Sequence, residues 1–126
     1  MLWIAIAAGG ALGSLARHAV NVAFTHFLGR AVPFATAMVN IVGSLTIGAL
    51  AGLLASGRLH MSVTTQAFVF VGILGGFTTF SSFMLDVFTL AQGGQSTLAI
   101  GNLAVQVGVG LLAVYTGYFT ATLGRG

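Results

Sequence analysis

The feature that most limits how this chain can fold is its scarcity of charged side chains. Charged residues make up 4% of the 126 residues, as four arginines, no lysine and a single acid, against roughly 25% in an average soluble domain. A chain with so little charge cannot cover itself with a solvated surface. Hydrophobic residues make up 57%, mostly in runs of about 20 residues, the length needed to cross the roughly 30 Å hydrocarbon core of a bilayer. The sequence therefore predicts an integral membrane protein.

Four apolar runs follow one another, separated by short polar or glycine-rich links. The predicted spans are about 2–23, 33–55, 64–91 and 97–123, and Pro33 suits the first turn of the second helix. Together the spans occupy nearly all of residues 1–126. We therefore expect one all-α domain of four transmembrane helices.

The third run contains a polar, glycine-rich segment at mid-membrane depth. Residues 72–83 read Gly-Ile-Leu-Gly-Gly-Phe-Thr-Thr-Phe-Ser-Ser-Phe. Backbone that leaves the helix inside a bilayer must have its polar groups satisfied by protein, water or ions, so helix breaks occur beside cavities. The segment predicts a broken third helix with a site beside it. The alternative is a continuous helix, kinked at most, whose Ser and Thr hydroxyls bond back to its own carbonyls.

The arginines favour no orientation in the membrane. Four spans place Arg58 and Arg125 on one side and leave Arg30 and Arg17 on the other, whereas orientation normally follows an excess of Lys and Arg in cytoplasmic loops. Four helices are also few to enclose a pore, and two oppositely inserted copies would reproduce the inverted-repeat symmetry of many transporters. We expect an antiparallel, dual-topology homodimer.

Small residues at four-residue spacing are candidate helix–helix contacts, because they let backbones approach closely. The sets are Gly9 with Gly13, Gly10 with Ser14, Ser44 with Gly48 and Gly52, and Ala113 with Gly117 and Ala121. Each set is compatible with an interface between two copies and with packing inside one subunit.

Amide side chains inside the spans are candidate anion donors. Asn40 lies about seven residues into the second run, and Gly43 follows one turn later on the same face. On the fourth run, Asn102 and Gln106 share one helical stripe with Gly110. An amide in lipid normally faces protein or water, and its NH₂ group can donate to an anion. The alternative is a hydrogen-bonded amide pair that holds two helices together.

Phe80 and Phe83 lie one helical turn apart. The edge of an aromatic ring is the positive end of its quadrupole, so two ring edges can flank an anion without holding it tightly. The alternative is ordinary packing.

Arg17 lies near the end of the first run and Asp86, the only acid, lies in the third. A charged residue costs about 3 kcal/mol at the bilayer centre. Arg17 should therefore reach an interface or pair with Asp86, and the functional reading is a vestibule that attracts anions.

Several function classes are excluded by composition. One acid and three peripheral histidines provide no nucleophile, base or metal-binding constellation, so we do not expect an enzyme. The arginines form no cluster that could follow a nucleic-acid backbone, and nucleic acid is not an expected partner.

Three motifs together resemble the Fluc/CrcB family of fluoride channels. They are Gly9-Gly10-x-x-Gly13-x-x-x-Arg17, Val39-Asn40 with Gly43, and the segment from Gly72 to Phe83. The resemblance implies passive, selective export of fluoride across the bacterial inner membrane, which lowers cytoplasmic fluoride. It also implies a multi-pass, dual-topology homodimer with two narrow pores, a broken third helix and a structural sodium ion at the centre of the interface.

The resemblance also implies roles for individual residues. The backbone carbonyls of Gly75 and Thr78 would bind sodium, two from each subunit. Phe80 and Phe83 would line the pore and Asn40 would donate to fluoride, with the hydroxyls of Thr79 and Ser81 along the polar path. Asn102 and Gln106 stand where the family often has hydroxyl residues, and Asp86 resembles a shortened form of a family glutamate.

A small dual-topology drug/proton antiporter is the alternative function. That class has four short spans but needs a titratable acid in its first helix. Here the first span carries Arg17 and no acid, which favours the channel.

Overall fold

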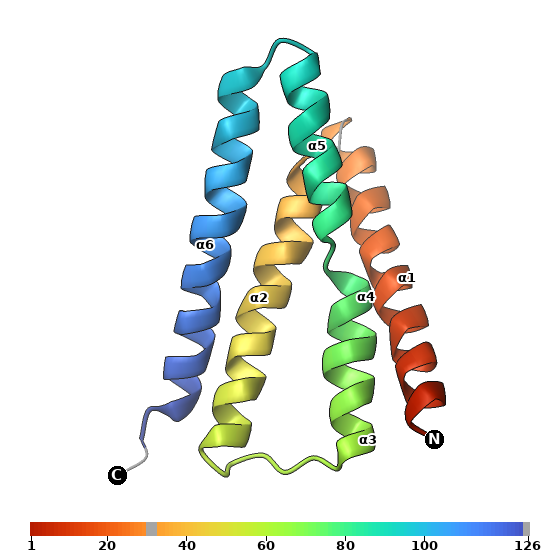
Figure 1. Ribbon diagram of the computed structural model, residues 1–126, viewed down its shortest axis with the longest axis vertical. Helices are drawn as coiled ribbons and strands as arrows, with labels where there is room; N and C mark the ends of the chain where they lie inside the picture. Colours follow the sequence, from red (N-terminus) through yellow and green to blue (C-terminus); the bar gives the residue numbers. More distant parts are fainter. Residues whose placement is uncertain (30–32, 125–126) are drawn as a thin grey trace.

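The computed structural model describes residues 1–29 and 33–124, and every regular element in these ranges is helical. The elements are α1 (Leu2–Leu28), α2 (Phe34–Ala55), α3 (Val63–Gln66), the π-helix η1 (Ala67–Leu74), α4 (Gly75–Phe77), α5 (Phe80–Gln92) and α6 (Ser96–Thr122). The elements α3, η1, α4 and α5 follow one another along a single long helical segment, which we call the third span (Figure 1).

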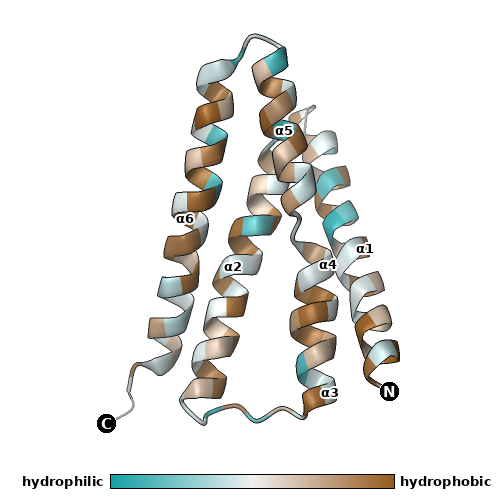
Figure 2. Ribbon diagram, viewed as in Figure 1, coloured by the Kyte–Doolittle hydropathy of each residue, from teal (hydrophilic) through white to brown (hydrophobic). Residues whose placement is uncertain are grey.

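Three helical segments of the described chain are long and apolar enough to cross a membrane: α2, the unit Val63–Gln92 and α6. Figure 2 shows apolar residues along the length of all three. The protein is thus a multi-pass membrane protein. Helix α1 has 27 residues but is not among these three segments, and it carries Arg17 and His18.

The start of α1, the α2–α3 loop with Arg58 and the end of α6 lie at the same end of the bundle (Figure 1). This agrees with the expected order of the spans. Arg30 and Arg125, on which the predicted two-against-two distribution of arginines also depends, lie outside the described residues.

The helix bounds differ from the predicted spans mainly at the end of α1. We expected a polar link after residue 23, but the helix continues to Leu28 and ends at Gly29, whose φ of 73° is left-handed. Residues 24–28 contain no glycine or proline, and the Thr25 hydroxyl bonds back to the Asn21 carbonyl within the helix. The expectation that Pro33 opens the second helix is off by one residue, because Pro33 is its N-cap.

The third span changes partner halfway along its length. Its first half, η1 with α4, packs along α1, whereas α5 packs against α6, and α5 makes no comparable contact with α1 in the described chain. Helix α2 packs along α6. The interruption of the third span therefore joins two helix pairs, α1 with η1–α4 and α2 with α6.

Glycines allow the backbones of the two helices in each pair to approach closely. A Cβ atom added to Gly13 would collide with the carbonyl of Ile73 in η1. Between the other pair, a Cβ on Gly48 would collide with the Val114 carbonyl, and one on Gly117 with the Leu45 carbonyl. The predicted small-residue contacts are thus made inside one subunit, which decides between the two alternatives for these glycines.

This packing predicts that Gly13→Ala destabilises the subunit. The added methyl group must push α1 away from η1, and overpacking of this kind typically costs about 1–3 kcal/mol. Gly10→Ala is the matched control, because a Cβ on Gly10 meets nothing within 4 Å. Denaturation in mixed micelles should give a lower free energy of unfolding for Gly13→Ala than for Gly10→Ala. Equal values would contradict the packing of α1 on η1.

Arg58 ties the α2–α3 loop to the end of α6. Its Nη1 donates to the Ala121 carbonyl at 3.1 Å and its Nη2 to the Leu123 carbonyl at 2.6 Å. A cation at a helix C-terminus satisfies the last carbonyls and interacts favourably with the helix dipole.

Candidate functional site

The third span is interrupted at Thr78 and Thr79. Both have extended backbones, with φ and ψ of −85° and 159° at Thr78 and −153° and 120° at Thr79. The prediction of a broken helix is confirmed, and the continuous helix is wrong. The continuous-helix alternative also predicted that Ser and Thr hydroxyls bond back to carbonyls of their own helix. Thr78 does so, since its hydroxyl donates to the Leu74 carbonyl at 2.9 Å.

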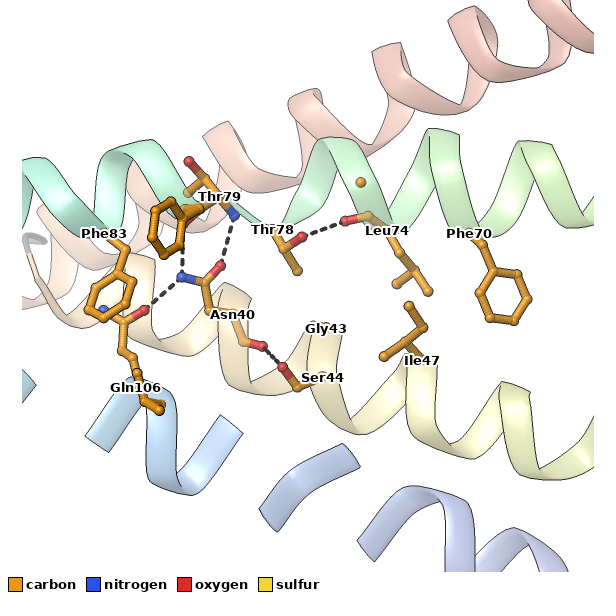
Figure 3. A pocket seen from close by; sticks show the side chains of 13 residues that line it. Asn40, Gly43, Ser44, Ile47, Phe70, Leu74, Thr78, Thr79, Phe83 and Gln106 are labelled. Carbon is orange, nitrogen blue, oxygen red and sulfur yellow. Dashed lines mark hydrogen bonds between the residues drawn. The ribbon is translucent and has the colours of Figure 1, made fainter. Parts of the chain in front are cut away.

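The side chain of Asn40, on α2, bonds to both backbone groups of Thr79 (Figure 3). Its Oδ1 accepts from the Thr79 N–H at 2.8 Å, and its Nδ2 donates to the Thr79 carbonyl at 3.0 Å. The same Nδ2 donates to Oε1 of Gln106, on α6, at 2.6 Å. A single amide thus replaces the helical hydrogen bonds that Thr79 lacks.

The interruption redirects two backbone N–H groups. In a continuous α-helix, the N–H groups of Thr79 and Ser82 would bond to the carbonyls of Gly75 and Thr78. Here the Thr79 N–H bonds to Asn40, and the Ser82 N–H bonds to Oγ1 of Thr79 at 3.2 Å. The Gly75 and Thr78 carbonyls therefore lose their usual helical donors.

A groove of about 430 Å³ runs beside the interruption (Figure 3). It is lined by Asn40, Gly43, Ser44, Ile47, Phe70, Leu74, Gly75, Thr78, Thr79, Phe80, Phe83, Gln106 and Val107. Of the predicted site residues, the groove gathers the pair Gly75 and Thr78 with Asn40, Thr79, Phe80, Phe83 and Gln106. It does not include Ser81 or Asn102.

The two predicted aromatic residues differ in their exposure. Phe83 is 5% exposed, whereas Phe80 is 74% exposed. Their ring centroids are 6.0 Å apart and their planes meet at 83°, an edge-to-face arrangement. Phe80 therefore presents ring surface at the open side of the groove.

Sequence reasoning missed several residues of the groove. Ser44 lies one turn after Asn40 and donates to the Asn40 carbonyl at 2.7 Å, and its i, i+4 spacing from Asn40 was the available signal. The apolar lining by Ile47, Phe70 and Leu74 had none, because these residues look like ordinary lipid-facing or core positions. Gly43 is needed for space, since a Cβ there would collide with the methyl group of Thr78.

A smaller cavity of about 220 Å³ lies on another side of the interruption. It is lined by Ser14, Arg17, His18, Asn21, Thr36, Val39, Thr79 and Ser82. Thr79 thus belongs to both cavities. Arg17 contributes a positive charge to this polar cavity.

Arg17 and Asp86 form no ion pair among the described residues. Asp86 is 7% exposed, its side chain interacts with that of Thr36 on α2, and its Oδ2 has no hydrogen-bond partner in the described chain. Arg17 instead lines the smaller cavity. The ion-pair alternative is therefore not found among the described residues, although Thr36, the partner of Asp86, also lines the cavity of Arg17.

The amides of α6 continue the hydrogen bonding from Asn40. Gln106, which is 6% exposed, donates from Nε2 to Oδ1 of Asn102 at 2.9 Å. The Nδ2 of Asn102 is buried and has no partner among the described residues.

A helical, multi-pass membrane protein with an interrupted helix beside a groove that carries amide, hydroxyl and aromatic side chains belongs to the class of membrane transport proteins. The family described as "CrcB-like protein, Camphor Resistance (CrcB)" matches residues 4–118. The chain belongs to the CrcB family.

Several proteins similar to this chain carry the name "Fluoride-specific ion channel FluC". The protein from Rhodospirillum centenum is 46% identical over 116 residues, which cover 92% of this chain and 88% of the relative. The protein from Nitrobacter winogradskyi is 45% identical over 109 residues, covering 83% and 86%. The protein from Rhodospirillum rubrum is 40% identical over 124 residues, covering 98% and 96%.

Proposed function

We propose that this protein is a fluoride-selective channel that conducts the ion passively out of the cell. The main observation in support of this proposal is the similarity over nearly the whole chain to relatives named as fluoride-specific ion channels. It favours the channel over the drug/proton antiporter, and it makes the protein a transporter rather than an enzyme.

The proposed path follows the groove beside the interruption. Fluoride is small and strongly hydrated, so a pore must replace its water with donors while binding it weakly enough for release. The groove combines two aromatic rings, Phe80 and Phe83, with the hydroxyl of Thr79 and the amides of Asn40 and Gln106. Neutral donors and ring edges suit this balance, because each of them binds the ion only weakly.

In this proposal, the smaller cavity that contains Arg17 is a vestibule through which the anion enters. Arg17 lies in it without the neutralising partner that Asp86 would have provided. A positive charge in a confined cavity raises the local concentration of anions. The shared residue Thr79 makes the interruption the boundary between this vestibule and the groove.

The functional unit in this proposal is an antiparallel homodimer. The face that carries the groove is open in the subunit, with Phe80 74% exposed, and a second copy would enclose it. The chain has no cysteine, so Gln95→Cys gives a single reactive site in the α5–α6 turn. An impermeant maleimide applied from one side should label about half of the copies if both orientations are present; labelling of all or none would contradict dual topology.

Fluoride efflux from liposomes tests the proposed function. Purified protein in vesicles loaded with potassium fluoride, with a potassium ionophore to balance charge, should release fluoride rapidly. Vesicles loaded with potassium chloride are the control and should release little chloride. Absence of fluoride release from vesicles that contain folded dimer would overturn the channel assignment.

A sodium ion at the centre of the dimer fits the free backbone oxygens. The carbonyls of Gly75 and Thr78 lack their usual helical donors, and hard cations prefer oxygen ligands. These carbonyls would hold the ion, which would supply fixed positive charge and join the two subunits.

Removal of sodium should therefore weaken the dimer. Exchange of sodium for N-methylglucamine is expected to lower fluoride efflux and to increase the monomer fraction, measured by photobleaching of labelled protein in vesicles. Exchange of chloride for gluconate at constant sodium is the control. An unchanged dimer fraction and efflux without sodium would remove this part of the proposal.

A further inference from the structure

The smaller cavity, of about 220 Å³, is lined by a second ionisable side chain besides Arg17, the imidazole of His18. Helix α1 turns a polar face toward this cavity, because Ser14, His18 and Asn21 lie at i, i+4 and i+7 and Arg17 lies beside them. His18 is exposed in the subunit. We expected all three histidines to be peripheral, but His18 borders the vestibule.

The other walls of this cavity carry no charge. Helix α2 contributes Thr36 and Val39, and the third span contributes Thr79 and Ser82. Helix α1 packs against α2, α3, η1 and α4, and none of these four segments contains a titratable side chain. The only acid of the chain, Asp86 on α5, interacts with Thr36 but does not line the cavity. The positive charge that faces the cavity therefore comes from α1.

The two other histidines lie outside this cavity. His26 is also on α1, but its ring contacts Phe27 edge to face, with 5.0 Å between the ring centroids, and it does not line the cavity. His60 lies in the loop between α2 and α3 and does not line it either. The chain thus provides two matched controls of the same residue type.

The number of positive charges in the cavity depends on pH. A histidine side chain changes its charge between about pH 5 and 8, whereas an arginine side chain stays protonated. The cavity therefore contains one cation in alkaline solution and two in acid. A further positive charge in a confined cavity raises the local concentration of anions, and dissolved salt screens this attraction.

We infer that His18 makes the entry of fluoride dependent on pH. Protonated His18 adds a second positive charge to the vestibule and speeds the capture of the anion, and neutral His18 leaves Arg17 to act alone. The inference rests on the proposed conduction of fluoride and on the vestibule. Because His18 acts on capture, its effect is largest when fluoride is scarce and disappears when fluoride saturates the channel.

Chemical charging of position 18 tests this without a change of pH. The chain has no cysteine, so His18→Cys provides a single thiol. A cationic methanethiosulfonate should raise fluoride efflux at low fluoride roughly threefold to tenfold, and an anionic one should lower it. A neutral methyl reagent is the control for size, and His26→Cys and His60→Cys should respond to none of the three. Equal inhibition by both charged reagents would overturn the inference, because bulk rather than charge would then act at position 18. No effect of either reagent would also overturn it.

The pH dependence of efflux provides the second test. Efflux at low fluoride should rise as the pH falls from about 8 to about 5, with protein-free vesicles at each pH to correct for HF that crosses the bilayer. His18→Gln should remove this dependence and keep the low rate, His18→Arg should keep the high rate at every pH, and His60→Gln should behave like the unmodified protein. A pH dependence that survives in His18→Gln and disappears in Asp86→Asn would assign the switch to the carboxyl group instead. No efflux by the unmodified protein at any pH would refute the channel itself.

Discussion

Asn40→Asp is expected to reduce fluoride efflux by at least about 100-fold. The carboxylate keeps an acceptor for the Thr79 N–H, but it puts a second oxygen against the Thr79 carbonyl and the Gln106 oxygen, which now accept at 3.0 Å and 2.6 Å. Leaving a buried polar group unsatisfied costs about 1–3 kcal/mol, and two are affected. The new negative charge also repels an anion in the groove. Efflux from vesicles measures the change, and 100-fold corresponds to about 2.7 kcal/mol.

Gln66→Glu is the matched control for this variant. It makes the same amide-to-carboxylate change at an exposed residue of α3, outside the groove. It should conduct like the unmodified protein. If both variants conduct normally, Asn40 neither holds the interruption nor borders the path.

Phe80→Ile is expected to lower fluoride efflux about tenfold, equivalent to about 1.4 kcal/mol, because the aromatic edge beside the ion is lost. The ring is 74% exposed in the subunit, so its replacement leaves no cavity, and the loss of its edge-to-face contact with Phe83 should cost the subunit only about 0.5–1.5 kcal/mol of stability. Efflux and thermal denaturation of the same preparations measure the two effects separately.

Phe88→Ile provides the comparison. Phe88 lies on the same helix, α5, and is 60% exposed, but it does not line the groove. Its replacement should leave efflux unchanged. An equal loss of efflux in both variants would attribute the effect to the surface of α5 in general and remove Phe80 from the pore.

The bounds of the helices were largely predictable because apolar runs and turn residues are local signals. Three of the four predicted spans agree with the helices to within one residue at each end. The exception was the end of α1, where His26 looked like part of a polar link although it is helical. A single polar residue does not end a helix, and residues 24–28 contain no glycine or proline.

The position of the interruption depended on contacts that the sequence does not reveal. Gly75 and Gly76 marked the segment as unusual, yet both are helical, and Gly76 serves close packing, since a Cβ there would lie 2.7 Å from the Gly10 carbonyl. The backbone leaves the helix at Thr78 and Thr79, where the Asn40 side chain competes for the hydrogen bonds of Thr79. Predicting this would have required knowing which face of α2 turns toward the third span.

The same limit applies to the amide residues. Their positions on α2 and α6 were clear from the sequence, and both predicted roles, donor and interhelical link, were reasonable. Asn40 turns out to be linked to Gln106, so the alternative of an amide pair between helices is found here. The direction of these hydrogen bonds follows only from the backbone of Thr79, whose N–H must donate and whose carbonyl must accept.

The long sequence separations around Asn40 also set an order of events during synthesis. Asn40 is made 39 residues before Thr79 and 66 residues before Gln106. At roughly 5–20 residues per second, Asn40 is synthesised roughly 3–13 s before Gln106. The groove thus has no complete form until the C-terminal helix has been translated, and a nascent chain stopped before α6 is expected to carry an amide at mid-membrane depth without the Gln106 bond.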